Sequence, residues 1–151
     1  MTLVQDILSN LVGELLFAIA SVVLGYFMLR YRSAAESTKG KPILSPDKRK
    51  VAFEHKGEIW VDGNNLTHHT ANDNQVLWSP EGKYFAFVSE RDYNPEVYIA
   101  VIATRKLIRV TDLPGIDQPV GWNEHGDLMI STQANGIVMI RKEDIEERAN
   151  G

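Results

Sequence analysis

Four short apolar runs in the middle of the chain most constrain its fold. They occupy residues 76–78, 84–88, 97–102 and 107–110. Turn-forming residues separate them: Ser79, Pro80 and Gly82 stand where a type I turn prefers Ser, Pro and Gly, and Asn94 and Pro95 mark the next loop. Runs of strand length bounded by turns predict a four-stranded antiparallel meander over residues 75–111.

The same pattern occurs on both sides in weaker form. Ser45, Ser79 and Asn123 hold equivalent turn positions, separated by intervals of 34 and 44 residues. The first unit has Lys48 where the middle unit has its turn glycine, and the third unit has neither the proline nor the acidic residue at its third strand. Intervals of this size are typical of propeller blades. The sequence therefore predicts about three related β units over residues 43–140.

The middle unit resembles the TolB-like propeller repeat. The resemblance is carried by Trp78, the turn at 79–82, Ala86-Phe87, the loop at 89–92, residues 96–98 and the strand end at 109–111. It implies an all-β domain made of antiparallel blades, with a partner-binding role. The residues expected to form blade cores or to carry the repeat are Trp60, Trp78, Ser79, Pro80, Gly82, Phe87, Tyr98 and Trp122.

Closed propellers use four to eight blades, so three units do not close a ring by themselves. We expect an all-β soluble domain, a partial β-propeller of about three meander blades. Exposed sheet faces in such a wedge favour a binding partner, and a homodimer is one open alternative.

Residues 11–29 form a nineteen-residue run with one charge, Glu14. A helix of this length rises about 28 Å, close to the ~30 Å hydrocarbon core of a bilayer. A signal peptide would need basic residues ahead of the run, and residues 1–10 contain none. The sequence predicts one N-terminal transmembrane α-helix that is retained.

Small and polar residues recur along one stripe of this helix: Asn10, Glu14, Ala18, Ser21 and Gly25. Small residues allow helices to approach closely in a membrane, and an intramembrane carboxylate is costly without a partner. We interpret the stripe as a contact with another membrane helix. The alternative is that Glu14 reaches the interface and that the small residues have no special role.

Basic residues follow the run and none precedes it: Arg30, Arg32, Lys39, Lys41, Lys48, Arg49 and Lys50. The positive-inside bias therefore predicts an inner-membrane protein with its N-terminus outside and its β domain in the cytoplasm. A periplasmic domain is the alternative, if location follows the TolB resemblance. The predicted organisation is a helical segment at 1–32, a linker at 33–42, the β domain at 43–140 and a charged tail at 141–151.

Composition excludes several classes of function. A net charge of −4 argues against nucleic-acid binding, and zero cysteines exclude disulfides and thiolate chemistry. His55, His68 and His69 are unsuited to one metal ion because adjacent strand residues point to opposite faces. The carboxylates that invite a hydrolytic reading lie mainly in turns, where Asp and Glu have local structural reasons to occur: Asp47, Glu81, Asp92, Asp112, Asp117 and Glu124. We expect no enzyme activity, cofactor or metal.

Three hypotheses remain. The favoured one is a non-enzymatic accessory subunit that packs through its helix against integral membrane subunits of a larger complex, in contact with the lipid bilayer. Such a complex could be respiratory, photosynthetic or a transport assembly. The second is a membrane-tethered TolB-like module for transient peptide or protein binding, and the third is a remnant of a propeller hydrolase.

Overall fold

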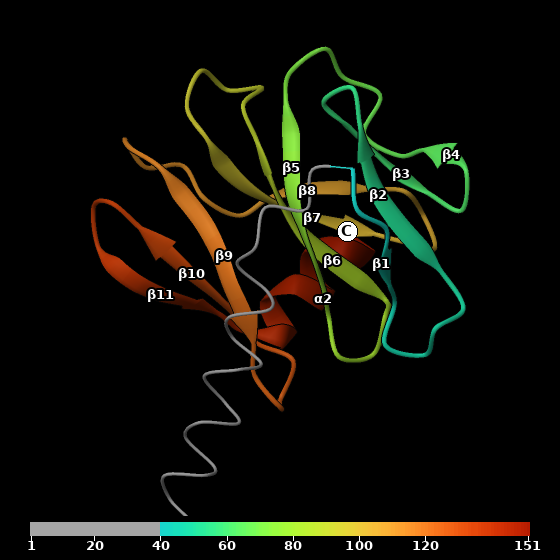
Figure 1. Cartoon of the computed structure of the whole chain (residues 1–151). Helices are drawn as coiled ribbons and strands as arrows, with labels where there is room; N and C mark the ends of the chain where they lie inside the picture. Colours follow the sequence, from blue (N-terminus) through green and yellow to red (C-terminus); the bar gives the residue numbers. More distant parts are fainter. Residues whose placement is uncertain (1–39) are drawn as a thin grey trace, which may run out of the picture. The chain divides into compact units, whose positions relative to one another are not determined.

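The computed structural model describes residues 40–151, which form three antiparallel sheets and one short helix (Figure 1). The first sheet contains β1 (Ile43–Leu44), β2 (Val51–His55), β3 (Glu58–Val61) and β4 (Asn64–Asn65). The second contains β5 (Asp73–Trp78), β6 (Tyr84–Ser89), β7 (Glu96–Val101) and β8 (Leu107–Arg109). The third contains β9 (Asp117–Trp122), β10 (Leu128–Thr132) and β11 (Gly136–Ile140), and helix α2 (Lys142–Asn150) follows it.

Neighbouring strands pair in sequence order within every sheet, so each sheet is a simple meander. The prediction of a mostly β domain with three antiparallel units is confirmed. The four strands of the middle unit lie where the apolar runs placed them, although β5 begins three residues earlier, at Asp73. The third unit has three strands.

The charged tail predicted at 141–151 is largely helical. Acidic Glu143 and Asp144 lie in the first turn of α2 and Arg148 lies in the last, an arrangement that complements the helix dipole. Ile145 is buried in the packing between the second and third sheets. Because Ile145 is the only apolar residue of this helix apart from Ala149, apolar periodicity gave no indication of it.

The predicted helical segment at 1–32, with the membrane helix at 11–29 and its stripe from Asn10 to Gly25, lies outside the described residues. The same is true of residues 33–39 of the predicted linker. Within residues 40–151, no helix has the length and apolar character needed to cross a bilayer.

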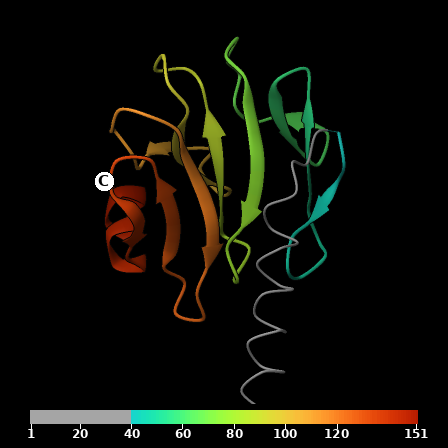
Figure 2. The ribbon, with the colours of Figure 1, turned by 60° about the vertical axis from the view of Figure 1, so that its left-hand side comes forward.

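The three sheets lie side by side in sequence order, and an apolar cluster fills each of the two junctions (Figure 2). Between the first and second sheets the cluster includes Ile59, Phe85 and Phe87, all with no exposed surface. Between the second and third it includes Ile99, Leu128 and Ile130. Every residue of β6 and β7 is buried, because the second sheet has a neighbour on both faces.

Tryptophan side chains link consecutive sheets by hydrogen bonds. The indole Nε1 of Trp78 donates to the backbone carbonyl of Ile43 at 3.3 Å, and that of Trp122 donates to the carbonyl of Leu77 at 3.0 Å. Trp78 and Trp122 hold equivalent places at the ends of β5 and β9. Trp60 lies on β3 and is equivalent to Tyr98 by strand pairing. The equivalent place in the first sheet belongs to Leu44.

The first turn of each sheet has the same geometry although only two of the three turns contain glycine. Backbone amides of Lys48, Gly82 and Gly126 donate to the carbonyls of Ser45, Ser79 and Asn123, three residues earlier. All three residues have positive φ, at 59° for Lys48 and 69° for Gly82. A residue with a Cβ atom is strained in this conformation, so Lys48 is a local defect in the repeat.

Replacing Lys48 with glycine should therefore stabilise the domain. We expect Lys48→Gly to raise the free energy of unfolding by about 0.5–1 kcal/mol, because the relieved strain exceeds the added flexibility of the unfolded chain. Urea unfolding of the full chain in mild detergent, followed by tryptophan fluorescence, measures the change. Arg49→Gly, one residue later, is the control and should not stabilise; an equal gain in both variants would contradict the argument.

Candidate functional site

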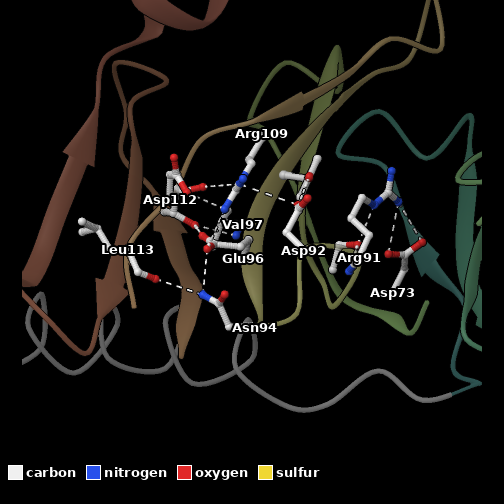
Figure 3. A network of polar contacts seen from close by, with 12 residues as sticks. Asp73, Arg91, Asp92, Asn94, Glu96, Val97, Arg109, Asp112 and Leu113 are labelled. Carbon is white, nitrogen blue, oxygen red and sulfur yellow. Dashed lines mark hydrogen bonds and ion pairs between the residues drawn. The ribbon is translucent and has the colours of Figure 1, made fainter. Parts of the chain in front are cut away.

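Polar side chains gather around two loops that project from the same end of the second and third sheets (Figure 3). One loop, residues 90–95, joins β6 to β7, and the other, residues 110–116, joins β8 to β9. We call residues 90–95 together with 110–116 the loop platform. Residues of both loops meet around Glu96 at the start of β7.

Glu96 is the centre of this network, since it is buried at 1% exposure and carries a carboxylate. Arg109 Nη2 lies 2.9 Å from its Oε1, and the Thr111 hydroxyl donates to its Oε2. The amide of Asn94 donates to the same Oε1 at 2.8 Å. A charged group removed from water needs such partners, so the network holds both loops against β7.

Arg109 connects the two loops by ion pairs. Beside Glu96, its guanidinium lies 2.7 Å from Asp112 and 3.7 Å from Asp92. Burial alone would lower the pKa of Arg109, but the hydrogen bond and charge of Glu96, with the other two carboxylates, raise it by more. Arg109 therefore remains cationic and bridges an acidic residue of each loop.

Asn94 ties the backbones of the two loops together. Its Nδ2 donates to the carbonyls of Leu113 at 3.0 Å and Gly115 at 3.4 Å. Tyr98 fixes the base of the first loop by a hydrogen bond between its hydroxyl and Asp92. Burial, together with this bond, raises the pKa of Tyr98 to about 12, so the phenol stays protonated.

A second ion pair lies at the other side of the first loop. Arg91 contacts both carboxylate oxygens of buried Asp73, at 3.3 and 3.2 Å, and its guanidinium lies 4.8 Å from the centre of the Tyr98 ring. Stacking of this kind uses the planar face of arginine while its edge bonds a carboxylate. Arg91 thereby packs the first loop onto the second sheet.

The side chains on top of this network are apolar and exposed. Tyr93 is fully exposed at 105%, with φ of 73°, and Ile116 is 54% exposed. The backbone amide of Ile116 is held by the side-chain oxygen of Gln133 at 3.3 Å. A rigid base thus carries an aromatic and an aliphatic side chain in contact with solvent, an arrangement suited to binding a protein surface.

The other candidate groups are dispersed. Asp47 accepts hydrogen bonds within its own turn, Glu81 pairs with Lys142 at 3.4 Å, and Glu124 is exposed beside His125. Within residues 40–151, no three acidic or histidine side chains lie close enough together to hold a metal ion. The three histidines considered above, His55, His68 and His69, therefore form no such group. The repeat residues form structure: Ser79 and Gly82 close the first turn beside Pro80, and Phe87 and Tyr98 lie in the first cluster.

Asp117 is the residue whose role sequence reasoning missed. It begins β9 as Asp73 begins β5, and it pairs with Thr132 as Asp73 pairs with Ser89. Asp73 receives Arg91, two residues after Ser89, whereas the residue two after Thr132 is Ala134. Asp117 has no exposed surface, and neither carboxylate oxygen accepts a hydrogen bond of normal geometry from the described residues. Comparing the two repeats position by position would have identified it.

Burial is the largest influence on the pKa of Asp117 and raises it, and the charge of Glu96 adds to this effect. The Thr111 hydroxyl and the Gln133 backbone lower the pKa, but the net shift is upward. A carboxyl group whose pKa is higher in the folded state destabilises that state when it ionises. The stability of the domain should therefore fall as pH rises from about 4 through the folded-state pKa of Asp117.

We expect Asp117→Asn to be more stable than the natural chain at pH 7, with the difference shrinking towards pH 4, where the natural carboxyl is protonated. Urea midpoints at both pH values test this. Asp127→Asn is the control of opposite sign, because hydrogen bonds from Asn123 and the Lys142 backbone lower the pKa of Asp127. It should be less stable at pH 7 and recover in acid. A pH-independent effect of Asp117→Asn would contradict the argument.

The Glu96–Arg109 pair should show strong coupling. Arg109→Gln leaves a buried carboxylate without its cation, and we expect a loss of about 2–3 kcal/mol in unfolding free energy. In the double variant Arg109→Gln with Glu96→Gln, the total loss should be smaller than the sum of the two single losses. Urea unfolding measures all three, with exposed Arg105→Gln as the control. Simple additivity would rule out the pair as a unit.

Comparison with known proteins supports the fold. The chain aligns with a TolB-type protein from Agrobacterium tumefaciens at a TM-score of 0.54 and 17% identity, covering 67% of this chain and 44% of that one. It also aligns with TolB from Acinetobacter baumannii at a TM-score of 0.49 and 18% identity, covering 66% of this chain and 31% of that one. No family model matches the sequence, and no curated protein matches it. The chain thus spans less than half the length of these TolB structures. The likeness to the Agrobacterium structure supports a partial, propeller-like fold for its three sheets.

Proposed function

We propose that this chain is a non-enzymatic, single-pass membrane accessory subunit whose β domain binds a protein partner through the loop platform. The observation that carries the proposal is the exposed side chain of Tyr93, held on a loop that Arg109, Asn94 and Tyr98 fix from below. The proposed partner belongs to an integral membrane protein complex.

The polar network supports binding because it prepares the loops in advance. A loop that must be ordered when a partner arrives loses conformational entropy, and that loss weakens binding. Here Asn94 joins the two loops and Arg109 neutralises a carboxylate from each. Exposed tyrosine is a frequent anchor at protein interfaces because it adds a large contact area with few rotatable bonds.

The same network argues against hydrolysis at this end of the sheets. Asp92 and Asp112 are both held by Arg109, and Glu96 is buried beneath them. A general base or acid needs a carboxylate positioned to exchange a proton with a substrate. These carboxylates instead accept hydrogen bonds that position loops, which fits a binding role.

The membrane part of the proposal rests on the sequence of residues 11–29 and on the basic residues that follow them. A tethered domain meets membrane partners at a high local concentration, so even a modest platform suffices for a stable assembly. The TolB likeness adds a second candidate, transient capture of a peptide or protein by a tethered module.

Purification of the tagged full chain in mild detergent, with mass spectrometry of the proteins that accompany it, tests the proposal. We expect a stoichiometric set of integral membrane proteins, and we expect Tyr93→Ser to reduce their recovery about five- to tenfold. His125→Ala, on an exposed turn at the opposite end of β9, is the control and should retain them.

A second variant tests the helix stripe separately. Gly25→Leu should weaken recovery of the membrane proteins while the β domain stays folded, because a large side chain prevents close helix approach. If neither Tyr93→Ser nor Gly25→Leu alters recovery, the accessory-subunit proposal fails. Loss of a weakly bound soluble protein alone, with no membrane set, would favour the transient binding module.

A further inference from the structure

The first and third sheets each have an apolar outer face whose equivalent in the second sheet packs against a neighbouring sheet. Strand pairing defines the equivalence: Leu128 pairs with Trp122 as Phe85 pairs with Trp78, and Met129 pairs with Met139 as Ala86 pairs with Ile99. Each position on the first and third sheets can therefore be compared with its equivalent in the second sheet, where both faces are buried against a neighbour.

On the third sheet, the residues at these positions are apolar and open. In the second sheet Ala86, Val97 and Ile99 are at most 1% exposed, because they face the third sheet. Their equivalents in the third sheet are Met129, Ile137 and Met139. Of these, Ile137 is 65% exposed and Met139 is 56% exposed. We call Met129, Ile137 and Met139 the trailing face.

On the first sheet, the opposite side is also apolar, and it is partly exposed. In the second sheet Trp78, Phe85, Phe87 and Tyr98 lie in the cluster that faces the first sheet. The equivalent residues of the first sheet, which we call the leading face, are Leu44, Val51, Phe53 and Trp60. Leu44 is 54% exposed, and the Phe53 and Trp60 rings stack at 6.4 Å.

The leading and trailing faces correspond to the two sides of one junction, which this chain already forms twice. The first junction joins Ala52, Ile59 and Val61 to the aromatic side of the second sheet, and these three are the equivalents of the trailing face. A trailing face is therefore complementary to a leading face. The residues named for both faces are apolar, so their contact would bury apolar surface.

We propose that two copies of this chain join through these faces, the trailing face of each copy packing on the leading face of the other. A head-to-tail contact either extends into a filament or closes when the rotation permits. Each copy contributes three sheets, so two copies make six, within the four to eight that close a propeller. The result is a two-fold ring with two identical junctions.

The junction between copies lacks one interaction that both internal junctions have. Trp78 and Trp122 each donate to a carbonyl of the preceding sheet, at Ile43 and Leu77. At the junction between copies, Leu44 takes the place of the tryptophan, and the equivalent acceptor is the carbonyl of Gly121. The contact is therefore apolar and weaker than the internal junctions, and the dimer dissociates on dilution.

Sedimentation of the purified full chain in mild detergent tests the association. We expect a reversible dimer whose dissociation constant rises about 100-fold in Met139→Glu, because a carboxylate would be buried at the junction. Leu44→Trp should lower the constant about tenfold by supplying the indole donor. Lys56→Ala changes the net charge by the same amount as Met139→Glu but lies in a loop away from both faces, so its constant should be unchanged.

Crosslinking tests the head-to-tail geometry directly, because the chain has no cysteine. Leu44→Cys and Met139→Cys chains, treated with a short bifunctional maleimide, should give covalent dimers only when the two variants are mixed. Covalent dimers from either variant alone would show a face-to-face contact and overturn the proposal. A chain that remains monomeric, or a dimer that Met139→Glu leaves intact, would also overturn it.

Dimer formation can be tested separately from partner binding by the loop platform. Tyr93→Ser should leave the dimer of the purified chain unchanged, since the loops project from the end of the sheets. If Met139→Glu instead releases a different protein while the purified chain is monomeric, the trailing face accepts a sheet from another protein and the two-copy ring is wrong.

Discussion

Packing of one sheet against the next is the interaction on which the rest of this structure depends. Each sheet is a meander of short strands, and short meanders are marginal alone because one face remains open to water. The second sheet has a neighbour on both faces, and every residue of β6 and β7 is consequently buried. Phe85 and Phe87 on one side and Ile99 on the other fill the two junctions. The indole bonds of Trp78 and Trp122 add direction to this otherwise non-directional contact.

The loop platform follows from the same packing. Burial of the second sheet removes Glu96 from water, and a buried carboxylate requires Arg109, Thr111 and Asn94 as partners. Thr111 lies in the loop after β8 and Asn94 lies in the loop before β7. The hydrogen bonds to this one carboxylate therefore hold both loops in place. Burial of Glu96 thus leads to a pair of loops held in fixed positions. Tyr93 lies on one of these loops, so the position of its backbone is fixed as well.

Sequence reasoning located the middle sheet well because its residues satisfy several rules together: strand-length apolar runs, a Ser-Pro-Glu-Gly turn and a polar loop. It was less successful where one rule failed. Helix α2 has a single large apolar residue, Ile145, and therefore no periodicity. In β9, Pro119 weakens the strand pattern, although the structure tolerates it on an edge strand beside a bulge.

The loop platform was only partly visible in the sequence. The resemblance at 89–92 and 109–111 contained Arg91 and Arg109, but the contacts among Glu96, Asn94 and Leu113 join residues up to 19 positions apart. Such contacts depend on how far each loop projects, which local patterns do not specify. The differences between repeats carry more information than their similarities. In the third sheet Ala134 and Gly136 replace Arg91 and Glu96, so its polar network is lost, yet Met129, Ile137 and Met139 keep the apolar character of a buried face. The third sheet has thus lost the polar side chains that hold the loops of the second sheet, but it has kept apolar side chains on its outer face. This combination fits a sheet that packs against a neighbour and has no loop platform of its own.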